Sequence, residues 1–386
     1  MKFLSCGGKN KPVRVFSAVL VICILCTLFA LPSAVSAVSN DDDLVDIKNH
    51  WAEGVIQKWV SKGLAKGYGN GRFGPGENIT RAEFVTLLNR IFGYEEKSEK
   101  SFPDVKPGAW YATELAKAYK AGIISGDSNG NMNPEAPISR QEAAVILCRA
   151  FSLIGDHPDT APKYADQNQI ADWALGSVGI MASMGYVTGR PGNLFAPRAN
   201  LTRAEALKMI DNVMGEMINT PGTFTVLVPG NMTVSSPGVI LKDTHIAGDL
   251  YLTGGIGSDT IQLIGVEVKG RTVIAGGKEV VLKGGFDRIT VVAPQTVVSL
   301  EAGTVGNLVI DKGAEGARIE VKDGTVVATL TLYAGADITG GKNIKHAVIS
   351  SGGVSMDKKP QQVTIAEGGQ AVSYHSGNTQ GQPTMR

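Results

Sequence analysis

One short pattern occurs three times in this chain and constrains its fold more than any other feature. A hydroxyl residue, an arginine, a free position and a glutamate follow one another as "TRAE" at 80–83, "SRQE" at 139–142 and "TRAE" at 202–205. This spacing is a capping box, in which the hydroxyl accepts from the third helical N–H and the carboxylate accepts from the N–H of the cap. Apolar residues at helical spacing follow each copy, so three equivalent helices are expected to begin here.

The repeat extends far upstream of these boxes. Before each hydroxyl come a proline at five residues, an apolar residue at seven, and glycines at thirteen and seventeen. Further upstream lies a tryptophan, and before it an aspartate. Each unit is therefore predicted to be a helix, a glycine-rich loop and a second helix. Three units that are too small to bury their own apolar faces should pack on one another.

Capping does not explain the arginine in each copy. Arg81, Arg140 and Arg203 fall at the first helical position, where the helix dipole mildly disfavours a cation. Free N–H groups at a helix start attract anions, and a guanidinium fork suits a carboxylate. The alternative is an ion pair inside the protein, with the upstream aspartates as partners. The residues themselves leave both interpretations open.

The second half of the chain has a different composition. All four tryptophans precede residue 220, whereas 27 of the 48 glycines follow it. From about Thr244, short Val/Ile/Leu/Thr runs recur at roughly 19 residues with Gly or Asp at the corners, which favours a parallel β-helix of stacked coils. A β-sandwich is the alternative. Pro221 and Gly222 are expected to end the last helix.

The first 37 residues are predicted to be a secretory signal, with a basic start, an apolar core and small residues up to Ala37. An uncleaved membrane anchor is the alternative, because the apolar run approaches spanning length. Cleavage would leave Cys148 as the only cysteine, and its apolar helical surroundings predict a buried, unreactive thiol. No membrane association is expected after cleavage.

Charge and carboxylate placement limit the function classes. Lys+Arg 37 against Asp+Glu 36 argues against nucleic-acid binding through bulk charge. The aspartates of the second half stand mostly alone in turns, and the histidines show no metal-ligand spacing. The expectation is therefore a protein without a catalytic site, metal or cofactor.

The repeats resemble the S-layer homology (SLH) domain family. The family's aromatic-x-Asp-Val start corresponds to "LVDI", "FPDV" and "YADQ", and its "ITRAE" signature to "ITRAE", "ISRQE" and "LTRAE". The resemblance covers about residues 44–217. It implies an all-α bundle with threefold pseudo-symmetry, exported by a Gram-positive-type bacterium. It also implies non-covalent anchoring to the cell wall by binding secondary cell-wall polysaccharide that carries pyruvate ketals.

The same resemblance assigns candidate roles to residues. The arginines would bind the pyruvate carboxylate, the aspartates would bond sugar hydroxyls or position the arginines, and the tryptophans would line the grooves. Taken alone, the tryptophans favour buried packing. The repeat glycines would let a loop backbone approach the sugar. The ligand-binding set is Arg81, Arg140, Arg203, Asp46, Asp104, Asp166, Trp51, Trp110, Trp173, Gly67, Gly126 and Gly189.

Departures from the family pattern at Leu44, Gln141 and Gln167 predict that the three grooves are not equivalent. Two other functions stay open: a glycan-cleaving β-helix enzyme tethered by the repeats, and a self-assembling surface-layer subunit with other surface-layer proteins as partners.

The expected division is signal peptide 1–37, linker 38–43, repeat units 44–93, 100–153 and 160–217, β-solenoid 222–374 and disordered tail 375–386.

Overall fold

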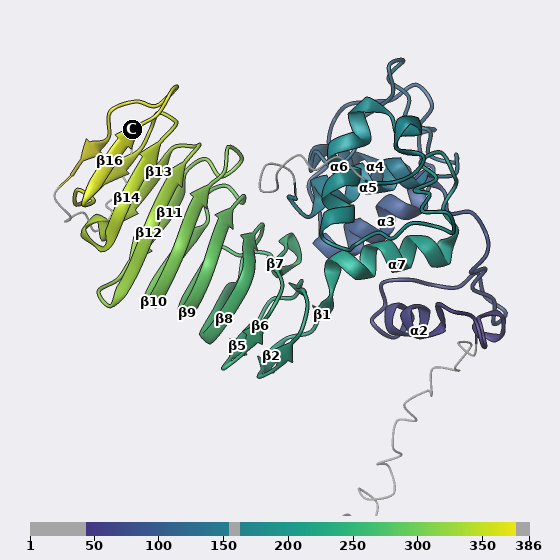
Figure 1. The fold of residues 1–386 in the computed structure, drawn as a ribbon, viewed down its shortest axis with the longest axis horizontal. Coiled ribbons are helices and arrows are strands. Elements are labelled where there is room, and N and C mark those ends of the chain that lie inside the picture. The colour runs from purple at the N-terminus through teal and green to yellow at the C-terminus, as the bar shows by residue number, and fades with distance from the viewer. Residues whose placement is uncertain (1–43, 154–162, 376–386) are drawn as a thin grey trace, which may run out of the picture.

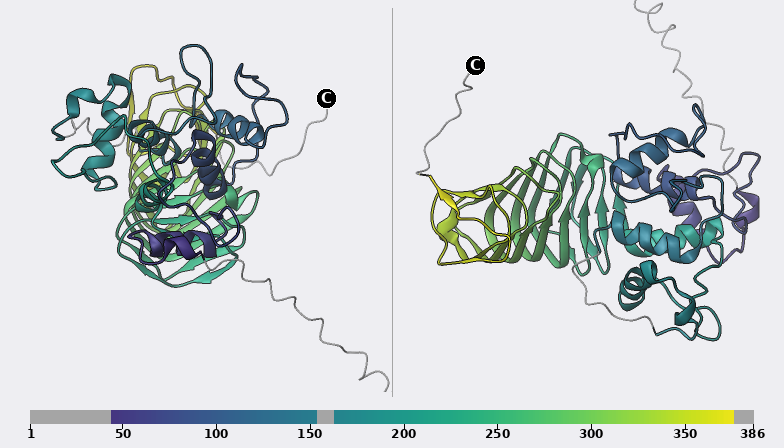
Figure 2. Two further views of the ribbon diagram at one scale, coloured as in Figure 1. Left: turned by 90° about the vertical axis from the view of Figure 1, so that its right-hand side faces the viewer. Right: turned by 90° about the horizontal axis from the view of Figure 1, so that it is seen from above.

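The computed structural model describes residues 44–153 and 163–375 of the chain. The predicted signal peptide and linker, and the tail from residue 376, lie outside the described residues. A helical bundle and a long stack of β-strands lie end to end, as Figures 1 and 2 show. No helix in the described ranges is both long and apolar enough to cross a bilayer.

The helical part consists of three helix–loop–helix units, as predicted. All three capping boxes are formed, with Thr80, Ser139 and Thr202 as the caps. Short 3-10 turns, η1 (Val45–Ile47) and η2 (Gln167–Gln169), precede the first and third units. The α-helices of the described part are α2 (Glu53–Ser61), α3 (Arg81–Phe92), α4 (Ala112–Lys120), α5 (Arg140–Ala150), α6 (Asp172–Ser183) and α7 (Arg203–Met214).

The three units close into a ring. The residue before each cap donates its N–H to the matching carbonyl of another unit: Ile79 to Leu201 (3.0 Å), Leu201 to Ile138 (3.0 Å) and Ile138 to Ile79 (3.1 Å). All three side chains are buried at the centre. The second helix of each unit packs on the first helix of the next, α3 on α4, α5 on α6 and α7 on α2. This is the predicted bundle with threefold pseudo-symmetry.

The second part is a parallel β-solenoid. Every strand pair in it is parallel, which confirms the β-helix and excludes the sandwich. Glu279 pairs with Val297, which pairs with Arg318, so the neighbours lie 18 and 21 residues apart. Val, Ile and Leu fill the interior of the stack.

The strands of the solenoid form one sheet. Two 3-10 turns, η3 (Gly254–Ile256) and η4 (Gly341–Asn343), interrupt it. The strands are β1 (Glu216–Ile218), β2 (Gly222–Phe224), β3 (Leu227–Val228), β4 (Met232–Val234), β5 (Val239–Lys242), β6 (His245–Ile246), β7 (Leu250–Leu252), β8 (Thr260–Ile274), β9 (Glu279–Val291), β10 (Val297–Ile310), β11 (Ala317–Val321), β12 (Thr325–Leu332), β13 (Ala336–Thr339), β14 (Ile344–Ile349), β15 (Ser355–Met356), β16 (Gln362–Ile365) and β17 (Ser373–Tyr374).

The change from helix to strand occurs earlier than predicted. Helix α7 ends at Met214, and β1 already pairs with β4 from Glu216. Gly215 makes this abrupt change possible, because it has φ +69° and a Cβ there would lie 2.0 Å from the Asn231 carbonyl oxygen. The expected helix end at Pro221 and Gly222 is therefore wrong, since the bundle and the solenoid share this seam without a linker.

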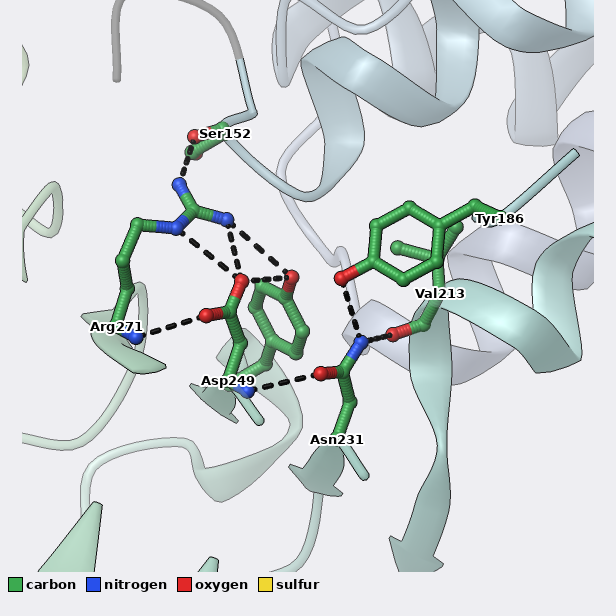
Figure 3. Close-up of polar contacts among 7 residues, drawn as sticks. Ser152, Tyr186, Val213, Asn231, Asp249 and Arg271 are labelled. Carbon is green, nitrogen blue, oxygen red and sulfur yellow. Dashed lines mark hydrogen bonds and ion pairs between the residues drawn. The ribbon is translucent and has the colours of Figure 1, made fainter. Parts of the chain in front are cut away.

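Buried polar side chains join the two parts (Figure 3). The carboxylate of Asp249 accepts from the guanidinium of Arg271 at 2.8 Å and from the backbone N–H of the same residue at 2.8 Å. Arg271 also donates to the Ser152 carbonyl in the bundle at 2.7 Å. Asn231 donates to the Tyr186 hydroxyl and to the Val213 carbonyl, both at 2.8 Å. These groups satisfy one another's hydrogen bonds where water is excluded.

Apolar contacts surround this polar joint. Tyr251 of β7 packs edge-on against Phe151 of the bundle, with ring centroids 4.9 Å apart. Met217, Tyr251 and Val273 belong to the hydrophobic core of the bundle, not to that of the solenoid. The first turns of the solenoid therefore complete the bundle core.

Candidate functional site

Each repeat arginine extends from its own unit into the loop of the next one. Arg81 donates to the Ser125 carbonyl (3.2 Å), Arg140 to the Thr188 carbonyl (3.2 Å) and Arg203 to the Lys66 carbonyl (3.0 Å). These three acceptors occupy the same repeat position, fourteen residues before the capping hydroxyl. The Nε atoms of Arg140 and Arg203 also donate, to the Phe195 and Phe73 carbonyls. The arginines thus join neighbouring units around the ring.

The backbone N–H groups at the starts of α3, α5 and α7 are already hydrogen-bonded. The backbone N–H of each arginine and of the following residue donates to carbonyls in the loop of another unit. In every copy the second acceptor is the repeat proline, Pro134, Pro197 or Pro75. The expectation that these helix starts present free N–H groups to an anion is therefore wrong, because the packing of the units uses them.

The repeat aspartates tie down loops of their own units. Asp46 accepts from the N–H groups of Phe73 and Gly74 at 2.8 and 2.7 Å, and Asp104 and Asp166 do the same in their units. Burial acts to raise the pKa of Asp46, but these backbone hydrogen bonds outweigh it and hold the pKa below its usual value.

Two of the three repeat arginines pair with glutamates instead of with these aspartates. Within the described part of the chain, none of the three aspartates makes an ion pair with a repeat arginine. Arg81 lies 3.5 Å from Glu142 and Arg203 lies 3.4 Å from Glu83, which are glutamates of the neighbouring capping boxes. The internal ion pair considered from the sequence exists, but the predicted aspartate partners are wrong.

The repeat glycines permit tight loops. A Cβ on Gly67 would lie 2.7 Å from the Arg72 carbonyl oxygen, so the loop could not fold back on itself with a larger residue. Added Cβ atoms on Gly126 and Gly189 would lie 3.1 and 3.2 Å from their nearest neighbours. Gly67 and Gly126 also line surface hollows between the units.

The repeat tryptophans are exposed, not buried. Trp51, Trp110 and Trp173 expose 63%, 61% and 59% of their surface, whereas the non-repeat Trp59 is fully buried. The interpretation as buried packing residues is therefore wrong. Large aromatic side chains left in water at equivalent places are typical of interaction sites.

Two of the three seams between units open as hollows. Groove 1, about 200 Å³, lies between the first unit's loop and α3, with Arg203 at one end and Trp110 at its rim. Groove 2, about 500 Å³, is its counterpart on the second unit, with Arg81 and Trp173 in the equivalent places. Each groove therefore combines the loop and helix of one unit with a tryptophan from the next unit and an arginine from the remaining one.

Each groove contains a second arginine that the repeat signature did not predict. Arg90 lines groove 1 and Arg149 lines groove 2, and both are exposed. They stand ten residues after the capping hydroxyl, in the last turns of α3 and α5, so aligning the repeats beyond the signature would have found them.

Groove 2 is lined by two arginines, Arg81 and Arg149, and by two carboxylates, Asp127 and Glu142. Burial lowers the pKa of Arg81, while Glu142 raises it and Arg149 lowers it further. The two arginines thus repel each other across the hollow, and Glu142 and Asp127 offset part of that repulsion.

The third seam differs from the other two. Asn212 replaces the second arginine, and it donates to the Tyr186 carbonyl at 2.8 Å. Arg190, in the loop of the third unit, forms an ion pair with Glu205 of α7 in the same unit at 2.6 Å. Trp51 is exposed but lines neither groove 1 nor groove 2. The third seam thus departs from the other two both in its residues and in how those residues are bonded.

The geometry defines a class of protein: a ring of three helical repeat units with grooves at its seams, continued by a parallel β-solenoid. The family model described as the S-layer homology domain matches residues 44–85, 101–144 and 163–207. The chain therefore contains three S-layer homology domains in tandem.

Curated relatives fall into two groups. The chain is 37% identical over 182 residues to an amylopullulanase of Thermoanaerobacterium thermosulfurigenes, covering 46% of this chain and 10% of that protein. It is 36% identical over 178 residues to the exoglucanase XynX of Acetivibrio thermocellus, covering 45% and 16%. It is 29% identical over 294 residues to the S-layer protein sap of Bacillus anthracis, covering 72% and 33%. The matches thus span a third or less of these relatives' own lengths.

Proposed function

We propose that this protein is a cell-surface anchor whose S-layer homology bundle binds an anionic cell-wall polysaccharide in grooves 1 and 2. The observation that carries the proposal is the recurrence, at two seams, of an exposed tryptophan beside two arginines. Polysaccharide sites need a flat aromatic face for a sugar ring, and a carboxylate is best held by guanidinium groups.

The arginines divide the work in this proposal. Arg90 and Arg149 are exposed, so a pyruvate ketal carboxylate can reach them directly. Arg203 and Arg81 are largely buried, and they add positive charge while they hold the groove wall. Trp110 and Trp173 supply the stacking faces. Asp46 and its two equivalents, together with the repeat glycines, shape the loops.

The wider setting follows from the same proposal. Residues 1–37 direct export, residues 44–217 bind the wall, and the solenoid projects as a spacer, adhesin or lattice module from the surface of a Gram-positive-type bacterium. Relatives named as S-layer proteins support display at the cell surface. Because the named hydrolases share parts of this chain, a tethered glycan-cleaving solenoid is the competing hypothesis. Release of reducing sugar ends from wall glycans would establish it; we propose that none is released.

The test measures binding of the mature chain to purified wall polymer, before and after chemical removal of its pyruvate groups. Exposed tryptophans can be replaced without disturbing the core, whereas the repeat arginines are buried in the ring. We expect Trp110→Ala and Trp173→Ala each to weaken binding roughly tenfold, or about 1.4 kcal/mol. The double variant and the polymer without pyruvate should show no measurable binding.

Trp51→Ala is the matched control, because it removes the equivalent tryptophan at the third seam, where Asn212 stands in place of the second arginine. It should bind like the parent protein. Equal binding to polymer with and without pyruvate would refute carboxylate recognition. An equal loss in all three tryptophan variants would refute the restriction to grooves 1 and 2.

A further inference from the structure

A second hollow adjoins groove 1. This side pocket, about 450 Å³, is lined by Asn89, Tyr94, Glu114 and Lys117 among others. It shares Thr86, Arg90 and Trp110 with groove 1, so the two hollows meet at Arg90 and Trp110. Its volume lies in the range of ligand sites in proteins.

The wall of the side pocket contains an incompletely bonded polar group. Asn89 is 4% exposed, and its amide nitrogen donates to the Glu114 carbonyl at 2.9 Å and to the Glu114 carboxylate at 2.7 Å. Its Oδ1 has no hydrogen-bond partner among the described residues. Buried acceptors in proteins are normally satisfied, and one water between this buried oxygen and a ligand in the pocket would complete it.

The equivalent place beside groove 2 is filled differently. Cys148 and Ser177 stand where Asn89 and Glu114 stand, and the thiol lies 3.5 Å from the Ser177 carbonyl oxygen. Ile180 replaces Lys117. The solenoid also contacts this region, because Arg271 donates to the Ser152 carbonyl. An apolar, covered surface thus replaces the polar pocket.

The third seam is filled by a salt bridge at the same place. Lys58 occupies the position of Lys117 and lies 3.1 Å from Asp211, the counterpart of Asn89. It also donates to the Gly215 carbonyl at 3.0 Å. Of the three equivalent places, therefore, only the one beside groove 1 combines a hollow with polar groups that are not fully used.

We propose that the side pocket is a second sugar subsite, so that groove 1 binds two consecutive residues of the wall polymer and groove 2 binds one. The inference rests on the proposed function. Lys117 and Glu114 already lie 3.6 Å apart, so the pocket does not call for a second anionic sugar. A neutral hexose or N-acetylhexosamine suits this lining, with Trp110 shared by the two sugars and a hydroxyl or acetamido N–H that reaches Asn89 through one water.

The test compares two fragments of the wall polymer by calorimetry: the pyruvylated terminal monosaccharide and the disaccharide that includes the next sugar. The full mature chain carries Trp173→Ala, which weakens groove 2. We expect the disaccharide to bind roughly tenfold more tightly than the monosaccharide. Asn89→Cys with Lys117→Ile installs the residues found beside groove 2, and it should abolish this gain while leaving monosaccharide binding unchanged.

Lys120→Ile is the matched control, since it removes an exposed lysine from the same helix outside the side pocket. This variant should keep the full gain in affinity for the disaccharide over the monosaccharide. Equal affinities for the two fragments in the parent protein, or a gain that survives Asn89→Cys with Lys117→Ile, would overturn the second subsite and leave the proposed function intact. If neither fragment binds, the proposed function fails and this inference fails with it.

Discussion

The bundle and the solenoid are both built from repeats, but one closes and the other continues. In the bundle, the third unit returns to the first through Leu201, which bonds to the centre of both other units. In the solenoid, each turn pairs only with its neighbours, as β9 does with β8 and β10. A closed ring has seams on its outer surface where three units contribute side chains. A stack has none of these, so it provides length instead of composite sites.

The seam between the two parts sharpens this comparison. A solenoid leaves its first turn open, and repeat proteins need a cap at such an end. Here the bundle is that cap, and it uses buried polar groups as well as apolar ones. The orientation of the solenoid relative to grooves 1 and 2 is therefore set by buried contacts such as those of Asp249 and Arg271, not by a flexible linker.

The largest loss of stability is expected from a change at the joint between the bundle and the solenoid. Asp249→Ala leaves the Arg271 guanidinium buried without its carboxylate, since both side chains are 7% exposed in the folded protein. Loss of one partner from such a pair costs about 3–5 kcal/mol of unfolding free energy. Urea unfolding followed by fluorescence should show this loss, with bundle and solenoid unfolding at separate midpoints.

The control for the joint is an exposed pair within the stack. Lys283 and Glu301 lie 2.8 Å apart with side chains 44% and 36% exposed. Glu301→Ala should change stability by about 1 kcal/mol or less, because water screens such pairs. Similar losses in both variants would contradict the role given to the joint.

The ring itself is tested by Arg140→Ala. This change removes the donors to the Thr188 and Phe195 carbonyls, and an unsatisfied buried acceptor costs roughly 1–3 kcal/mol. Thermal unfolding should reveal a loss of about 2 kcal/mol. Arg198→Ala, at an exposed position, should stay within about 0.5 kcal/mol of the parent. A neutral result for Arg140→Ala would mean that the ring does not depend on these hydrogen bonds.

Removal of the hydroxyl from one capping box should lower the stability by a smaller amount. Ser139→Ala removes the side chain that accepts from the Glu142 N–H, and N-cap losses cost about 1 kcal/mol. Denaturant unfolding can measure this against Ser101→Ala, which lies in an exposed, irregular segment. A loss several times larger would show that Ser139 also supports the ring.

The smallest effect concerns Cys148, which faces α6 across a seam. Burial raises the pKa of its thiol to about 12, with only partial opposition from the Ser177 contact and Arg271. The folded chain should resist thiol-labelling reagents at pH 8.5 and react after denaturation. Because the pKa of the thiol is higher in the folded than in the unfolded chain, the protonated thiol favours the folded state. This contribution to the free energy of unfolding is complete below about pH 9 and is lost as the pH rises toward 12.

Labelling rate against pH is the measurement, and Cys148→Ala is the control. The variant should lack the part of the stability decrease between pH 9 and 12 that belongs to the thiol. Rapid labelling of the folded chain at pH 8.5 would contradict the buried seam.

Local patterns predicted much of the architecture. The three capping boxes, the helix–loop–helix units and the parallel coils were all predicted, since caps and hydrophobic periods depend on residues close together in the chain. The cysteine's burial followed from its helical neighbours in the same way. The division at residue 220 was less accurate, because the seam at Gly215 depends on the distant Asn231.

Only the tertiary structure decided which residues meet. The repeat arginines donate to loops some 44 to 137 residues away. The exposed Trp110 and Trp173 each lie in a groove whose other residues come from the neighbouring units. The open side pocket at Asn89 likewise depends on packing between units, because Glu114 and Lys117 of the next unit line it. By itself, the sequence determined three similar units and a stack of coils. The differences between the seams arose from long-range contacts, which no local pattern contains.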